Sequence, residues 1–182
     1  MKGGIVNADM RRILIIGSPG AGKSTFATHL SNVSHIPAIH LDKEYWQPGW
    51  VAPEAAYWNK KLAELISKPM WIIDGNYGAS LAQRLRMADT IIHLNIPTHI
   101  CLFHVIRRVI KWYSRQRPDM ASGCHEKFNF SFFRQILDYR RRQLPEDKAL
   151  LAQFSGTYVQ LASIDEINAL LRQIRIYYRS MP

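Results

Sequence analysis

The chain is constrained most strongly by a glycine-rich stretch, Gly17–Ser24, which directly follows the apolar run Ile13–Ile16. The stretch reads GSPGAGKS and fits the pattern G-x-x-x-x-G-K-[ST], and a helix-compatible run from Thr25 to Leu30 comes after it. Glycines in such a loop let backbone N–H groups converge on a phosphate, and the N-terminus of the next helix adds a favourable dipole. The pattern predicts a phosphate-binding loop between a strand and a helix; the alternative is a glycine-rich turn that binds nothing.

Two side chains of this loop indicate which phosphate compound it binds. Lys23 is placed to neutralise the β- and γ-phosphates of a nucleoside triphosphate, and the hydroxyl of Ser24 is a ligand for Mg²⁺. We therefore expect ATP and Mg²⁺ as cofactors, with Lys23 acting in catalysis.

Short apolar runs alternate with helix-compatible stretches along the chain, which is typical of βαβ units and a parallel sheet. The strands are expected at Arg12–Ile16, Ala38–Leu41, Met70–Ile73, Thr90–Leu94 and Thr157–Leu161. The helices are expected at Gly22–Ser31, Pro53–Ser67, Ala79–Arg86, Thr98–Arg115, Phe130–Gln143, Glu146–Phe154 and Ile164–Ile174. Pro53 suits the first position of a helix, and Ser163 followed by Glu166 fits a capping box. Right-handed crossovers bring the C-terminal ends of the strands to one edge, where open α/β sheets bind ligands.

Length and composition indicate one globular domain. The 182 residues are 47% hydrophobic and 21% charged, which are ordinary values. We expect a core of residues 11–97 and 145–176, an acceptor-side insertion at 43–68 and a lid at 115–130. No apolar run approaches the roughly 20 residues of a membrane span. Residues 1–10 have no apolar signal region and resemble a disordered lead-in, so we expect a cytoplasmic protein with no membrane partner.

Two aspartates come at the ends of expected strands. Asp74 follows Trp71–Ile73, which is where a nucleoside-triphosphate enzyme holds a carboxylate for its Mg²⁺. Asp42 follows Ile39–Leu41 and is placed to bind an acceptor or to deprotonate its hydroxyl. The alternative for each is a turn residue or a helix cap, since aspartate is common at both.

Positive charge is concentrated in one part of the chain. The net charge is +10, and between His104 and Gln143 there are ten basic and three acidic residues, a surplus of seven. Such a segment indicates an anionic partner, either nucleotide phosphates or a nucleic-acid backbone.

The helix from Thr98 onward runs into this basic segment. At 100° per residue its apolar side chains share one face and its basic side chains the opposite face. The apolar set is Leu102, Val105, Ile106, Val109 and Tyr113, and the basic set is Arg107, Arg108, Lys111 and Arg115. The loop after it, Met120–Asn129, has the composition of a mobile lid that closes over a triphosphate and supplies arginines; the alternative is a plain surface loop. His125 and Glu126 in this loop are expected to face solvent.

Two further clusters leave alternatives open. Arg140, Arg141 and Arg142 are placed either to reach phosphate or to pair with Asp138 and cap the end of a helix. The aromatic residues after Asp42 form either a stacking wall for a planar acceptor or, as we favour, the small core of the insertion. These aromatic residues are Tyr45, Trp46, Trp50, Tyr57 and Trp58.

The order of these features is similar to that of adenylate kinases and nucleoside monophosphate kinases. A closer resemblance is to the adenylate-kinase-related DNA topology modulation proteins (FlaR), and it covers about residues 12–174. The segments that carry it are Leu41-Asp42…Trp46, Asp74-Gly75-Asn76-Tyr77, Ala88-Asp89-Thr90-Ile91-Ile92 and Arg117-Pro118-Asp119…Gly123-Cys124…Glu126-Lys127.

The resemblance implies an α/β P-loop kinase fold with a five-stranded parallel sheet and a helical lid, and it implies ATP and Mg²⁺. By position, the nucleotide would be held by Gly20, Gly22, Lys23, Ser24 and Thr25, together with Gly17, Ser18 and Ala21 of the same loop. Arg107 and Arg108 would contact ATP near the lid, and Arg140 or Arg141 would clamp phosphate. We take Lys23, Asp42, Arg107 and Arg141 as catalytic candidates and Ser24 and Asp74 as metal ligands.

One departure bears on the acceptor. Adenylate kinases follow the Asp-Gly of the third strand with Phe-Pro-Arg, whose arginine binds the acceptor phosphate, whereas this chain has Asn76-Tyr77-Gly78. We expect ATP-dependent phosphoryl transfer to a small acceptor, either nucleotide-like or a hydroxyl metabolite. The alternative is a nucleic-acid-binding regulator of DNA topology that uses ATP as a switch or not at all.

Overall fold

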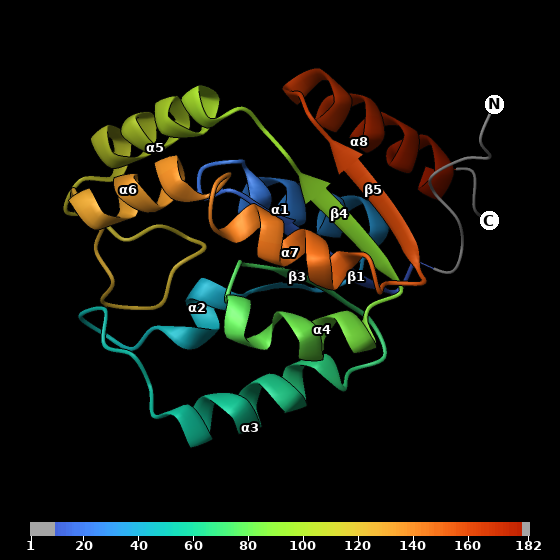
Figure 1. Cartoon of the computed structure of the whole chain (residues 1–182), viewed down its shortest axis with the longest axis horizontal. Coiled ribbons are helices and arrows are strands. Elements are labelled where there is room, and N and C mark those ends of the chain that lie inside the picture. The colour runs from blue at the N-terminus through green and yellow to red at the C-terminus, as the bar shows by residue number, and fades with distance from the viewer. Residues whose placement is uncertain (1–9, 180–182) are drawn as a thin grey trace.

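A computed structural model describes residues 10–179 of the chain. Five parallel strands form one sheet in the order β2-β3-β1-β4-β5 (Figure 1). The strands are β1 (Arg12–Gly17), β2 (Ala38–His40), β3 (Trp71–Asp74), β4 (Thr90–Leu94) and β5 (Thr157–Leu161). All five lie within about one residue of the ranges that the apolar runs predict. The lead-in expected over residues 1–10 lies outside the described residues except for Met10, which is buried in the core.

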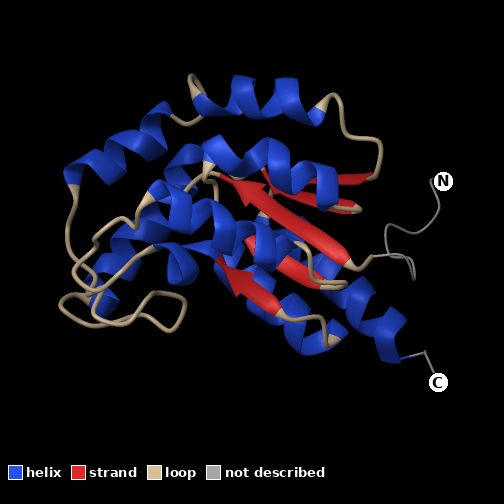
Figure 2. Cartoon of the chain, turned by 90° about the horizontal axis from the view of Figure 1, so that it is seen from below, coloured by secondary structure: helices blue, strands red, loops and turns tan. Residues whose placement is uncertain are grey.

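Helices cover both faces of the sheet (Figure 2). The longer helices are α1 (Lys23–Ser34), α3 (Ala55–Ile66), α5 (Thr98–Trp112), α6 (Phe130–Asp138), α7 (Gln143–Leu151) and α8 (Ile164–Arg179). The shorter ones are α2 (Leu41–Tyr45), the 3₁₀ turn η1 (Gly78–Ser80) and α4 (Leu81–Met87). No helix within residues 10–179 has the length and apolar composition needed to cross a membrane.

The alternation of side chains along β1 explains why the sheet is covered on both sides. Ile13 and Ile15 face a core cluster that includes residues of α1, α5 and α8, whereas Leu14 and Ile16 face a second cluster that includes residues of α3 and α4. Successive strand residues point to opposite faces, so a strand that is apolar at every position must be covered twice.

Several helix boundaries differ from those expected. Helix α3 begins at Ala55 with Glu54 as its N-cap, so Pro53 precedes the helix instead of opening it. Helix α6 ends at Asp138, and α7 begins at Gln143, so the three arginines at 140–142 lie between two helices. Half of the capping box of α8 forms as expected, because the Ser163 hydroxyl accepts a hydrogen bond from the N–H of Glu166 at 3.1 Å; the Glu166 carboxylate accepts from the N–H of Ala162, one residue before Ser163, at 2.7 Å.

The face of α5 that packs inward is shifted from the expected one, although Leu102, Val105 and Val109 pack against the core as expected. Cys101 and Val105 are buried, but Ile106 and Tyr113 are exposed and Arg108 points inward instead. Tertiary packing explains this difference. Cys101 and Val105 of α5 lie against Gly20 of the glycine loop, and Arg108 pairs with Glu126 in the segment that follows α5.

Candidate active site

The glycine loop lies at the carboxyl end of β1, between that strand and α1. Gly20 and Gly22 have φ angles of +81° and +90°, which L side chains rarely adopt. A Cβ on Gly20 would also collide with the backbone carbonyl of Cys101 in α5. The loop is therefore shaped by conformations and close approaches that its glycines alone permit, as a phosphate-binding loop requires.

Lys23, the first residue of α1, folds over this loop. Its Nζ donates hydrogen bonds to the carbonyl oxygens of Gly17 and Ser18, at 2.8 and 2.9 Å. Burial lowers the pKa of Lys23, while the charges of Asp74 and Asp42 act in the opposite direction. The ammonium group is thus held at the loop and is attracted by both predicted aspartates.

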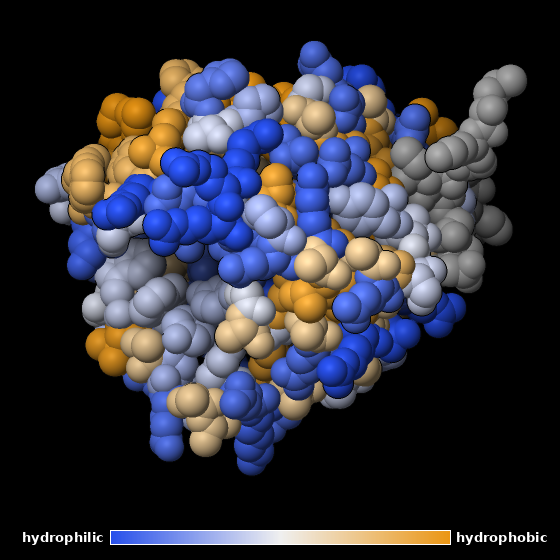
Figure 3. All heavy atoms as spheres, in the orientation of Figure 1, coloured by the Kyte–Doolittle hydropathy of each residue, from blue (hydrophilic) through white to orange (hydrophobic). Residues whose placement is uncertain are grey.

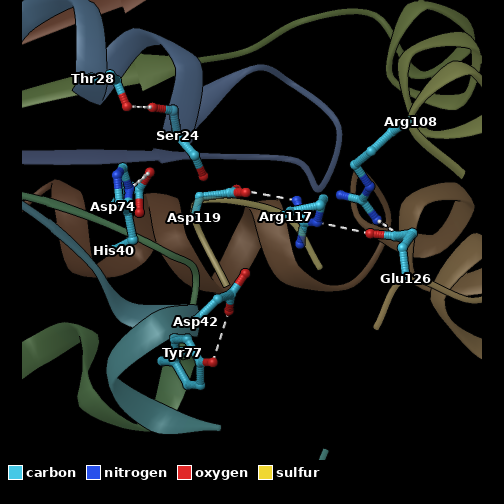
Figure 4. A network of polar contacts seen from close by, with 10 residues as sticks. All are labelled: Ser24, Thr28, His40, Asp42, Asp74, Tyr77, Arg108, Arg117, Asp119 and Glu126. Atoms are coloured by element: carbon cyan, nitrogen blue, oxygen red, sulfur yellow. Dashed lines mark hydrogen bonds and ion pairs between the residues drawn. The ribbon is translucent and has the colours of Figure 1, made fainter. Parts of the chain in front are cut away.

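Asp74 ends β3 beside the loop. Strand register pairs it with Ile15 of β1 on one side and His40 of β2 on the other. Its carboxylate is 3% exposed and lies 3.1 Å from Nδ1 of His40, a contact that raises the pKa of the histidine. In Figure 4 the side chain of Ser24 points to the same side of the loop as Asp74.

The Ser24 hydroxyl and the Asp74 carboxylate suit a Mg²⁺ ion that is bound mainly by nucleotide phosphates, and they do not form a complete metal site by themselves. Within residues 10–179, no group of three or more His, Cys, Asp or Glu side chains is arranged to hold a metal ion. Mg²⁺ usually keeps several waters and takes one or two protein ligands plus substrate phosphates. Ser24 and Asp74 fit that pattern.

Asp42 is the second residue of the short helix α2, two residues beyond the end of β2 at His40, and not directly at a strand end. Its Oδ1 accepts a hydrogen bond of 2.8 Å from the hydroxyl of Tyr77 (Figure 4). Burial raises the pKa of the Asp42 carboxyl, and the Tyr77 hydroxyl and the charges of Lys23 and Arg117 partly oppose this rise. A carboxylate with a raised pKa is better suited to accept a proton near neutral pH.

Arg84 belongs to this site although nothing in its sequence context marks it. It lies on α4 with no exposed surface, and its guanidinium donates to the carbonyls of Gly75, Asn76 and Tyr77 at 2.9 to 3.2 Å. Burial lowers its pKa to about 10. Arg84 therefore fixes the backbone of the loop that follows Asp74.

The lid segment, residues 115–130, packs over the same side of the molecule. Arg117 and Glu126 are buried, and Glu126 forms ion pairs with both Arg117 (2.8 Å) and Arg108 of α5 (3.2 Å). Arg117 also contacts Asp119 at 3.1 Å. The expectation that Glu126 faces solvent is therefore wrong, whereas His125 is exposed as expected.

Aromatic side chains join the lid to the insertion. Trp46 and Trp50 pack against a small cluster of Met120, Ala121 and Cys124 in the lid. Part of the loop expected to be mobile, Met120–Asn129, is therefore packed. Tyr45 and Trp58 contact each other edge to face at 5.0 Å between ring centroids, while Tyr57 is exposed.

The remaining arginine candidates differ in whether they contact other residues of the candidate site. Arg108 contacts Glu126 and its charge acts on Lys23, so it is part of the site. Arg140 makes long contacts of 3.4 and 3.5 Å to the carbonyls of Asn95 and Ile96 just beyond β4. Arg107 is exposed and lies over the ring of Phe103 on its own helix, and Arg141 is exposed between α6 and α7. Their catalytic role has no supporting contact and stays a prediction.

Part of the basic surplus is paired with carboxylates. Arg108 and Arg117 pair with Glu126, and Arg134 and Arg142 lie 3.7 and 3.8 Å from Asp138 at the surface. Figure 3 shows a hydrophilic patch where α6 and α7 meet, and Arg140, Arg141 and Arg142, which lie between these helices, are exposed.

Comparison with known proteins gives matches among solved structures only. No family model matches the chain, and no curated protein sequence matches it. Among solved structures, shikimate kinase from Acinetobacter baumannii in complex with shikimate has a TM-score of 0.60 at 16% identity, over 96% of this chain and 97% of that one. Shikimate kinase from Bacteroides thetaiotaomicron has a TM-score of 0.55 at 14% identity, over 93% and 98%. Shikimate kinase from Aquifex aeolicus has 0.50 at 18%, over 92% and 96%.

The chain has the P-loop kinase fold. Its five-stranded parallel sheet between helices matches these structures over nearly their whole length, and the expected nucleoside monophosphate kinase-like architecture is confirmed. At these identities the likeness shows the fold alone.

Proposed function

We propose that this protein transfers the terminal phosphoryl group of ATP to the hydroxyl of a small acceptor, with Mg²⁺ bound through Ser24 and Asp74. The observation that carries the proposal is the convergence of Lys23, Arg117 and Asp42. The charges of both cations act on the carboxyl of Asp42, which is half-buried. Two cations whose charges reach one half-buried carboxylate supply what phosphoryl transfer needs: charge stabilisation and a base.

Each residue has a distinct part in the reaction. The acceptor oxygen forms a bond to the γ-phosphorus as the bond from that phosphorus to the β-bridging oxygen breaks, and ADP leaves. Asp42 takes the proton of the acceptor hydroxyl. Lys23 and Arg117 hold the transferring group in place and balance its charge, and Mg²⁺, when bound, neutralises phosphate oxygens.

The acceptor side of the site favours a hydroxyl compound over a nucleoside monophosphate. The loop after Asp74 offers Asn76 and Tyr77 in place of an arginine, and the nearby Arg84 is committed to three backbone carbonyls. The matching structure from Acinetobacter baumannii holds shikimate, a small hydroxyl metabolite, which supports an acceptor of that general kind.

The proposal also includes a closer relationship to the DNA topology modulation proteins and, as a second function, DNA binding. Similarity to the DNA topology modulation proteins rests on the motif segments around Asp42, Asp74 and Arg117. DNA contact rests on the exposed arginines between α6 and α7. Because several basic residues of this region are already paired, we rank DNA binding below phosphoryl transfer.

One screen separates the two functions. ADP formation from ATP is measured with nucleosides, nucleoside monophosphates and small hydroxy metabolites, beside a titration with duplex DNA at several salt concentrations. Acceptor-dependent ADP formation that is lost in Lys23→Ala supports the enzyme. Sequence-dependent DNA affinity without any acceptor-dependent turnover supports the regulator and contradicts our proposal.

A further inference from the structure

The loop that follows β3, Gly75–Tyr77, is held in place by the buried guanidinium of Arg84. The guanidinium of Arg84 reaches three successive carbonyls, those of Gly75, Asn76 and Tyr77, and the acidic side chain of Asp147 lies close enough to favour its charged form. A buried cation is costly unless its N–H groups are satisfied, and here Nη1 and Nη2 donate to these carbonyls while Nε has no partner among the described residues. The hydrogen bonds from Arg84 therefore fix the positions of these three carbonyl groups.

This arrangement places the ring of Tyr77 among other aromatic side chains. Its centroid lies 4.8 Å from that of Tyr45 and 5.8 Å from that of Trp58. Packing on these two rings restricts the directions in which the phenol can point. The hydroxyl ends 2.8 Å from Oδ1 of Asp42.

The hydrogen bond has two consequences for Asp42. It occupies Oδ1 and leaves Oδ2 for the acceptor hydroxyl. It also stabilises the ionised carboxylate, because a phenol donates most strongly to a negative oxygen. The charged groups that act on Asp42 are Asp74, Lys23 and Arg117. Among the described residues, only Tyr77 forms a hydrogen bond with the carboxylate of Asp42.

We propose that Tyr77, held by Arg84, is a positioning residue that orients Asp42 and keeps it ionised for proton acceptance. The inference rests on the proposed function, in which Asp42 is the base. Tyr77 itself does not touch the transferring group in this account. Its loss is therefore expected to change the proton step and to leave ATP binding as it is.

The test compares Tyr77→Phe with Tyr45→Phe. Both variants remove one hydroxyl from the same aromatic group, but only the first removes the bond to Asp42. We expect Tyr77→Phe to lower kcat about tenfold, to shift the acidic limb of the kcat profile to higher pH, and to leave the KM for ATP unchanged. Tyr45→Phe is expected to behave like the native protein. A native pH limb in Tyr77→Phe, or the same shift in both variants, would overturn the proposal.

A second measurement does not depend on turnover. NMR titration of ¹³C-labelled aspartate carboxyls gives the pKa of Asp42 in the native protein and in both variants. We expect a higher pKa in Tyr77→Phe alone, and an unchanged pKa would overturn the proposal. If no acceptor yields ADP in the native protein, the proposed function fails, while this titration still decides whether Tyr77 controls Asp42.

Discussion

Nε of Arg117 lies 2.8 Å from Oε2 of Glu126, inside the lid. The contact is an ion pair, and both atoms are buried without a hydrogen-bond partner among residues 10–179. The other carboxylate oxygen of Glu126 pairs with Arg108 on α5. One buried carboxylate therefore holds two arginines that would otherwise repel each other, and it ties the lid to the helix beside the phosphate loop.

Replacing Glu126 by Gln removes the charge that both arginines share. We expect the free energy of unfolding to fall by about 3 kcal/mol, because Arg108 loses its counter-charge and the buried Arg117 keeps only Asp119. Denaturant unfolding followed by circular dichroism measures the loss. The matched control is Glu64→Gln, which changes an exposed glutamate on α3. Equal stability of Glu126→Gln and the native protein would contradict a structural role for the pair.

The Asp42→Asn variant tests the base. Asparagine keeps the size of the side chain but does not accept the acceptor proton, so we expect kcat to fall by roughly 10² to 10⁴ while the KM for ATP stays the same. Steady-state ADP formation with the acceptor found in the screen gives both constants. Asp165→Asn, at an exposed position of α8, serves as the control. A kcat within twofold of the native value would remove Asp42 from the proton step.

The pH dependence of the native enzyme follows from the same carboxyl. Burial raises the pKa of Asp42 above its ordinary value of 3.8. Below this raised pKa the carboxyl is protonated and no longer accepts a proton, so kcat falls as the pH drops through it. A profile of log kcat against pH is expected to bend at a higher pH than an ordinary aspartate would give. An acidic limb at or below that ordinary value would contradict the assignment.

His93 predicts a pH dependence of stability that is independent of activity. It is fully buried in β4, where Nδ1 contacts the hydroxyl of Tyr158 at 2.8 Å, and burial lowers its pKa to about 4. The unfolded chain has a histidine pKa near 6.5, so it binds more protons between these two values. Stability from His93 is therefore present above about pH 6.5 and is lost as the pH falls towards 4.

Denaturant unfolding of the native protein and of His93→Gln measures this contribution. Between pH 7.5 and pH 5 we expect the native protein to lose about 2 kcal/mol more than the variant. Other titrating groups are common to the two proteins and cancel in the difference. A constant difference between them would show that His93 is not held neutral.

The sequence predicts the sheet and the loop because their signals are local. Five apolar runs specify strands that are covered on both faces, and the GSPGAGKS pattern specifies the turn that follows the first of them. These features require no knowledge of how distant segments meet.

The acceptor side could not be predicted in this way. Arg84 lies two residues from the exposed Arg86 and looks like any surface arginine until α4 packs beneath the loop at residues 75–77. Arg117 and Glu126 are nine residues apart in an irregular segment, so no helical or strand period relates them. The inward face of α5 likewise depends on what covers it: its periodicity correctly places Leu102, Val105 and Val109 against the core, but it does not predict that Ile106 is exposed.

The central claim is that the loop of residues 17–24 binds a nucleoside triphosphate through Lys23. Isothermal titration calorimetry with ATP and Mg²⁺ tests it directly, on the native protein, on Lys23→Ala and on Lys60→Ala, an exposed lysine of α3. The account predicts saturable heat with the native protein and with Lys60→Ala, and at least tenfold weaker binding with Lys23→Ala. A folded native protein that gives no heat with ATP, or a Lys23→Ala variant that binds as tightly as the native protein, would contradict it.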